Sequence, residues 1–216
     1  MINLMRASAF GALATLALVA GVPAGAATVY SSAGFVPNGE TGDYYIASDG
    51  QSFIAATFTL SQQSEITGIG GVFTQFGDGG SIFGAIIAAP ASQNDVTASS
   101  LVNLSLAHTI FAPSADGSDL TTPVSALLGP GTYELVFGSG LWDTSGNSGL
   151  ATGMDGQANL LRTVDGGASW DVLNDSVRVT VEASPVPLPA GLPLLVSGVA
   201  AIGGLLRRRQ RTSIAA

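Results

Sequence analysis

All fifteen acidic residues of the chain lie between residues 27 and 184, and the segments on either side contain none. The same stretch has two basic residues, Arg162 and Arg178, so its net charge is −13. It also holds 22 of the 29 glycines. A domain of this size buries a substantial core, since about 150 residues bury roughly 68–70% of their unfolded surface. We therefore expect three parts, residues 1–26, 27–184 and 185–216.

Residues 1–26 are typical of a secretory signal peptide. One basic residue precedes an uncharged Ala- and Leu-rich run that ends near Val22, and Ala24 and Ala26 stand at the −3 and −1 positions of a cleavage site. The alternative is an amphipathic first helix of a cytosolic domain. Such a helix needs a polar face, and the run from Leu13 to Val22 offers only Thr15. The segment therefore predicts export.

The C-terminal segment predicts a single transmembrane helix. The nineteen residues from Leu188 to Leu206 carry no charge and are close to the ~20 that cross a hydrocarbon core. Arginines follow at once, which by the positive-inside rule holds the C-terminus in the cytoplasm and the acidic domain outside. The alternatives are a plain permanent anchor, or a buried core helix followed by a basic tail. We expect an inner-membrane-anchored precursor.

The tail resembles a known sorting signal. It has three parts in a fixed order. A five-residue motif, Val186 to Ala190 (Val186, Pro187, Leu188, Pro189, Ala190), is followed by the apolar segment and then by an arginine cluster, Arg207, Arg208 and Arg209. This order resembles the PEP-CTERM signal in its VPLPA variant, over residues 185–211. The two prolines cannot continue a helix and bias the residues before them to extended geometry, which suits a protease substrate.

The resemblance implies what happens to the chain. In those families an exosortase, a membrane-embedded cysteine protease and transpeptidase of Gram-negative bacteria, recognises the tail. Proteins with this tail are exported and are typically associated with extracellular polysaccharide. The mature form is then expected at the cell surface or outside the cell. Leu188 stands where the commoner signal has Glu, so recognition would require the variant enzyme.

The pattern of residues 27–184 favours strands. In residues 53–60 the side chains of Ile54, Ala56, Phe58 and Leu60 share one face, a period of two. Further strand-like runs lie at 66–76, 81–88, 127–137, 158–164, 169–173 and 176–181, separated by Gly, Asp, Ser and Asn turns. Residues 96–110 could instead be a helix, capped by Asp95 or Thr97. We expect an all-β fold, an antiparallel β-sandwich with jelly-roll-like connections.

One local motif resembles the Asp-box of sialidases and other secreted β proteins. Its defining positions are Thr163, Asp165, Gly167, Ser169 and Trp170. The resemblance implies a hairpin turn in which Asp165 bonds to turn backbone, Gly167 supplies a positive φ and Trp170 packs inward. A single copy argues against a sialidase propeller. We favour a structural hairpin over a ligand contact.

Other candidate sites are weaker. Oxygen ligands for Ca²⁺ could come from Asp116, Asp119, Asp143 and Asn147, although such residues also form ordinary turns and no twelve-residue EF-hand is present. Exposed aromatic rings that could contact carbohydrate are Trp142 and Tyr44. His108, the only histidine, is expected on the surface.

Composition and motifs exclude several classes. A chain with seven basic residues lacks the cationic stripe of a nucleic-acid binder, and the lack of Cys excludes a thiolate zinc site or an iron–sulfur cluster. No Gly-x-Ser-x-Gly elbow occurs. We expect a non-catalytic structural or adhesive protein without a cofactor, Ca²⁺ being a candidate. The alternatives are a module that binds extracellular polysaccharide and, third, a secreted glycoside hydrolase.

Overall fold

The computed structural model describes residues 26–36, 42–77, 79–114, 117–155 and 158–186. The predicted transmembrane helix at 188–206, Ala24 of the cleavage site, Asp116 and residues 187–190 and 207–209 of the sorting signal lie outside these ranges. Within the described ranges, no helix is both long enough and apolar enough to span a membrane.

The chain forms twelve strands, one α-helix and one short 3-10 helix in the described ranges. In chain order the elements are β1 Ala27–Ser31, β2 Gly42–Ile46, β3 Phe53–Leu60, β4 Ser64–Gln75, β5 Ile82–Ala88, η1 Gln93–Asp95, α1 Ala98–Leu104, β6 Ser105–Phe111, β7 Ser118–Leu128, β8 Gly131–Gly138, β9 Ser148–Thr152, β10 Ala158–Thr163, β11 Asp171–Asp175 and β12 Val179–Pro185.

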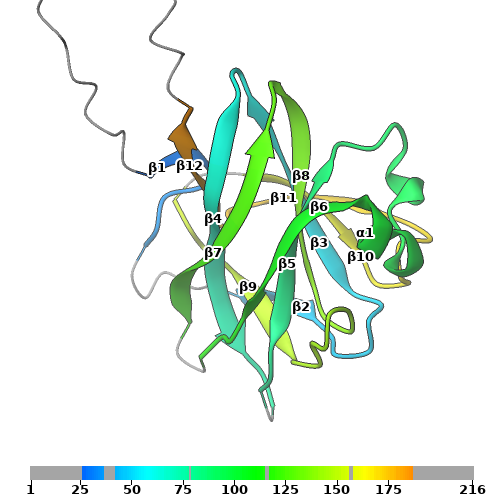
Figure 1. Ribbon diagram of the computed structural model, residues 1–216. Coiled ribbons are helices and arrows are strands. Elements are labelled where there is room, and N and C mark those ends of the chain that lie inside the picture. Colours follow the sequence, from blue (N-terminus) through cyan, green and yellow to red (C-terminus); the bar gives the residue numbers. More distant parts are fainter. Residues whose placement is uncertain (1–25, 37–41, 78, 115–116, 156–157, 187–216) are drawn as a thin grey trace, which may run out of the picture.

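Two antiparallel sheets of six strands each face one another (Figure 1). In sheet I, one edge of β4 pairs with β7, and its other edge pairs first with β12 and then, further along, with β9. Strand β1 pairs with the far edge of β12, and β2 pairs with the far edge of β9. Sheet II has the order β11-β10-β3-β8-β5-β6. Most consecutive strands belong to opposite sheets, so the chain crosses repeatedly from one layer to the other. The expected all-β antiparallel sandwich is confirmed.

The main core lies between the sheets, as alternation predicts. Ile54, Ala56, Phe58 and Leu60 of β3 all point into it, whereas Thr57 and Thr59 are exposed. Strand β12 is a second case, since Val179 and Val181 are fully buried, as is Val177 just before the strand begins. At the centre the ring centroids of Phe73, Phe111 and Phe137 lie 5.1 to 5.7 Å apart.

A second core covers the outer face of sheet II. Phe53, Phe83 and Val136 point outward from this sheet and are completely buried. The segment with η1 and α1 lies over them and contributes Val96 and Leu101. Both faces of sheet II are therefore apolar, which period-two alternation in β3 alone does not predict.

The candidate helix at residues 96–110 is only partly a helix. It begins as predicted, because Thr97 accepts a hydrogen bond from the Ser100 backbone N–H and closes a capping box. It ends at Leu104, and residues 105–111 form β6 against β5. The alternative of a helix through residue 110 therefore holds only to Leu104, because the paired edge of β5 offers β-branched Thr109 and Ile110 a better partner than helical hydrogen bonds do.

Candidate functional site

The ends of the domain and most of its loops lie at opposite poles. Pro185 at the end of β12 is in register with Ser64, and Ala27 is in register with Ala183, so the first and last strands meet at what we call the terminal pole (Figure 1). Gln75, at the far end of β4, marks the other end, the loop pole. The twelve residues of β4 span eleven steps of about 3.2 Å, which separate the two poles by about 35 Å.

Connections from both sheets gather at the loop pole. They are residues 47–52, 76–81, 139–147 and 164–170, which follow β2, β4, β8 and β10. Backbone hydrogen bonds link them: the Gly166 N–H donates to Gln51 O, and the Gly146 N–H donates to Ser81 O. The Asp-box turn and the candidate residues Trp142, Asp143 and Asn147 lie on these connections, so the fold brings them to one end of the molecule.

The Asp-box residues form the turn between β10 and β11. The carboxylate of Asp165 accepts from Ser169 Oγ at 2.6 Å, from Ser169 N at 3.0 Å and from Thr163 Oγ1 at 2.7 Å. Gly167 has a φ of +94°, and its N–H donates to Thr163 Oγ1. Trp170 packs on the second core. Each role that the resemblance implied is seen in this hairpin.

These hydrogen bonds also set the charge state of the turn. The bond from Ser169 Oγ, and then that from Thr163, hold the pKa of Asp165 well below its usual range. Asp165 is therefore ionised at neutral pH, with its oxygens occupied by the turn. Such a carboxylate stabilises a hairpin and has little capacity left for a ligand.

Trp142 is fixed by aromatic contacts. Its indole stacks on the His108 imidazole with a centroid distance of 4.4 Å and an interplanar angle of 15°, and it meets the Phe83 ring edge to face at 4.8 Å. Trp142 and Asp143 have φ values of +50° and +62°. Left-handed backbone costs about 1–2 kcal/mol per residue without glycine, so the ring stack compensates for local strain. One face of this predicted carbohydrate contact is already covered by His108.

Tyr44 and Tyr45 point to opposite sides of β2. Tyr44 packs against the main core, its hydroxyl donates to Asp175 Oδ2 at 2.8 Å, and Arg162 lies 6.0 Å from its ring centroid. Burial, and then the bond to Asp175, raise the pKa of Tyr44. The predicted contact at Tyr44 therefore lies at the edge between the sheets, and Tyr45 is the ring that faces solvent.

The three candidate calcium ligands within the described residues, Asp119, Asp143 and Asn147, do not form one cluster of carboxylates. Asp119 is on β7 and pairs with Arg178, whereas Asp143 is exposed on the 139–147 loop. The side-chain oxygen of Asn147 accepts from Tyr45 and Ser48. Over the ranges described, no group of three or more His, Asp and Glu side chains could hold a metal ion.

Glu134 is a buried acid that the sequence did not single out. It is 4% exposed on the outer face of sheet II, and Gln93 Nε2 donates to its Oε2 at 3.1 Å. Burial raises the pKa of Glu134, although the bond from Gln93 acts in the opposite direction. Its carboxyl group is thus covered by the segment that carries η1 and α1, and the pKa shift reflects packing.

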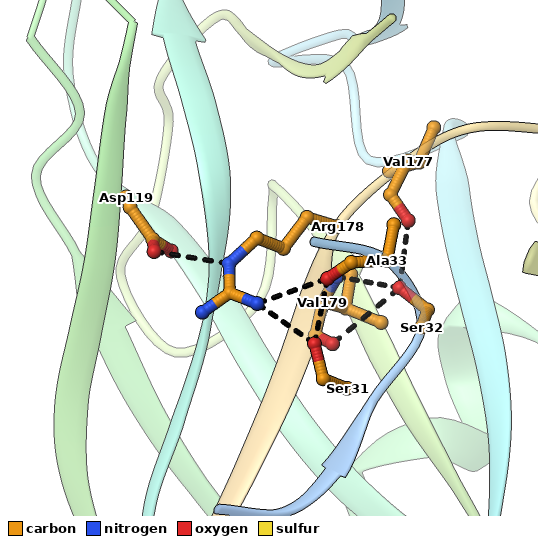
Figure 2. A network of polar contacts seen from close by, with 7 residues as sticks. All are labelled: Ser31, Ser32, Ala33, Asp119, Val177, Arg178 and Val179. Atoms are coloured by element: carbon orange, nitrogen blue, oxygen red, sulfur yellow. Dashed lines mark hydrogen bonds and ion pairs between the residues drawn. The ribbon is translucent and has the colours of Figure 1, made fainter. Parts of the chain in front are cut away.

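A polar network at the start of β12 was also missed by sequence reasoning (Figure 2). Arg178 donates from Nε to Asp119 Oδ2 at 3.0 Å, and from Nη1 to Ser31 Oγ at 2.7 Å and Ala33 O at 2.9 Å. The hydroxyl of Ser32 accepts from Val179 N and donates to Val177 O. The network ties the segment after β1 to β12 and β7. Contacts across almost the whole chain leave no local signal in the sequence.

Comparison with models of known protein families gives no match, and comparison with curated proteins gives none either. The residues and their geometry therefore carry the functional argument.

Proposed function

We propose that this chain is an exported protein whose acidic β-sandwich serves outside the cytoplasm as a non-catalytic structural or adhesive component. Its C-terminal tail anchors the precursor in the inner membrane and is processed by an exosortase. The mature protein then acts at the cell surface or in the extracellular matrix. The jelly-roll-like connectivity and the transmembrane sorting helix at 188–206 belong to the same proposal.

The observation that carries the proposal is the pairing of the first and last strands. Ala27, the residue after the predicted cleavage site, is opposite Ala183, two residues before the predicted sorting segment begins. The predicted signal peptide and the predicted tail would therefore adjoin neighbouring strands at one edge of sheet I. A tail attached at the terminal pole would leave the loop pole, about 35 Å away, facing outward.

The chemistry of the described side chains supports a non-catalytic role. The imidazole of His108 stacks on Trp142, and the Glu134 carboxyl group is covered by Gln93. The Asp165 oxygens are taken by the Asp-box turn. These groups serve packing and turn formation, which suits a domain displayed for its surface.

Protease accessibility and intact mass test the two halves of the proposal. In a Gram-negative host with the matching exosortase, we expect external protease to digest the domain and the mature protein to end before Leu188. A domain protected inside the cytoplasm would contradict export, and a mature form that retains residues 188–206 would contradict sorting. A variant with Pro187→Ala and Pro189→Ala should still be exported but should keep its tail.

A further inference from the structure

The loop pole carries one exposed aromatic ring that is held in place by its neighbours. Tyr45 lies on β2, the edge strand of sheet I, and is 41% exposed. Gly149, which has no side chain, stands directly opposite on β9. Gly149 is itself buried, so the β9 position paired with Tyr45 contributes no side chain beside this ring.

Two contacts fix the orientation of Tyr45. Its hydroxyl donates to Asn147 Oδ1 at 2.8 Å, and its ring lies 5.5 Å from the Phe76 ring at an angle of 52°. An exposed tyrosine would ordinarily rotate freely. Because this ring is already ordered, a partner that stacks on it loses less conformational entropy on binding than it would on a mobile side chain.

Asn147 is held more firmly than an ordinary loop residue. Its Oδ1 also accepts from Ser48 N at 2.9 Å, while its backbone O accepts from Phe76 N at 3.1 Å and its N–H donates to Gly79 O at 3.3 Å. With Oδ1 occupied by two donors, the two hydrogens on Nδ2 have no acceptor within the described part of the chain. They are a fixed pair of donors beside the exposed ring.

An ordered aromatic ring beside free amide donors suits a particular ligand class. A pyranose has an apolar C–H face that stacks on a ring, and hydroxyl groups at its rim that accept hydrogen bonds. The surrounding charge selects among saccharides, because Asp49 and Asp143 are exposed on the adjoining loops of a domain with a net charge of −13. Anionic polymers would be repelled.

We propose that Tyr45, Phe76 and Asn147 form a shallow site for a pyranose unit of a neutral polysaccharide. The ring of Tyr45 stacks on the sugar, Phe76 supports that ring from the side, and Asn147 Nδ2 donates to a hydroxyl. The site goes beyond the proposed function and does not depend on the sorting pathway. An experiment that refutes this sugar site would therefore leave the proposed export and sorting untouched, and an experiment that refutes export or sorting would leave the sugar site untouched.

Affinity electrophoresis of the full chain tests this site. The protein is kept in a detergent without a sugar headgroup, and the gels contain dextran, hydroxyethyl cellulose, galactomannan or, as the anionic probe, polygalacturonate. We expect retardation by at least one neutral polymer and none by polygalacturonate. Retardation by none of the neutral polymers, or by polygalacturonate alone, would overturn the proposal.

Variants locate the site. Tyr45→Ala should weaken binding at least tenfold, and Asn147→Asp, which keeps an acceptor for Tyr45 but loses the amide donors, should weaken it similarly. Phe35→Ala is the matched control, because Phe35 is 42% exposed but lies next to the Gly34–Asp155 bridge, beyond the other end of β9. Thermal unfolding confirms that each variant folds. Equal loss in Phe35→Ala, or unchanged binding in Tyr45→Ala, would refute the assignment.

Discussion

Replacing Arg178 by Gln should lower the unfolding free energy by about 2–3 kcal/mol. The bonds to Ser31 Oγ and Ala33 O each contribute about 1 kcal/mol. The ion pair with Asp119 adds about 0.5 kcal/mol, because its two side chains are 19% and 26% exposed and solvent weakens such pairs. At about 2–4 °C per kcal/mol for a domain of this size, Tm should fall by about 5–10 °C.

Three companion variants separate the contributions. Asp119→Asn should cost only about 0.5 kcal/mol, since it removes the ion pair and leaves the bonds to residues 31 and 33. Arg178→Lys should resemble Arg178→Gln, because an ammonium cannot span both sets of acceptors as the guanidinium fork does. Arg162→Gln is the matched control for the loss of a positive charge, since no hydrogen bond from the Arg162 side chain is found among the described residues and its guanidinium only lies 6.0 Å from the Tyr44 ring centroid.

Urea unfolding of the full chain in detergent measures these costs, and hydrogen exchange shows where they arise. In Arg178→Gln, the amides of Ser32 and Val179 should exchange faster, because the segment after β1 loses its attachment to β12. If Arg178→Gln cost no more than Asp119→Asn or Arg162→Gln, charge alone would explain the effect and the network would not hold the segment.

Three further predictions concern single positions. Because burial raises the pKa of Glu134, its folded form holds the proton more tightly than the unfolded chain. The free energy of unfolding should therefore fall as pH rises above 4.5. In urea titrations, Glu134→Gln should remove this dependence on pH and should be about 1 kcal/mol more stable than the native chain at pH 7. The pKa of Asp165 is shifted in the opposite direction, so its ionised carboxylate should stabilise the fold above pH 3.8, and this stabilisation should be lost as pH falls below that value. Acid unfolding of Asp165→Ala should not show this loss of stability. Gly84→Ala would place a Cβ 2.7 Å from the Phe111 ring; calorimetry should show destabilisation by about 1–3 kcal/mol, and an unchanged Tm would mean that the core can yield.

The sequence predicts strands best where a single face is buried. Along the inner face of β3, alternation matches the buried residues of the main core one for one, and in β12 it places Val179 and Val181 correctly, although Thr180 on the opposite face is buried too. The strands β1, β2, β6, β7 and β9 were not predicted, because their form depends on partners far along the chain. β7 even contains Pro123, which an edge strand tolerates since it need not donate on its free side. Residues 105–111 became a strand for the same reason, the pairing with β5.

The candidate sites divide in the same way. The Asp-box turn is local: its contacts span four residues or fewer, so the motif carried enough information to predict them. The contact between Tyr45 and Asn147 joins residues 102 apart, and that between His108 and Trp142 joins the middle of β6 to the 139–147 loop. Which of two adjacent tyrosines faces inward also depends on register, and a shift of one residue would exchange Tyr44 and Tyr45.

The position of β12 has a consequence for when the domain can fold. The last strand to be synthesised lies between the first strand, β1, and β4, so sheet I has a gap until the ribosome has passed residue 185. Until then, β1 has no neighbour and one edge of β4 is largely unpaired. Contacts this distant in sequence close late and slowly. Sheet I, and the main core that it covers, can therefore be completed only when synthesis of the described domain is almost finished, although the strands of sheet II do not depend on β12.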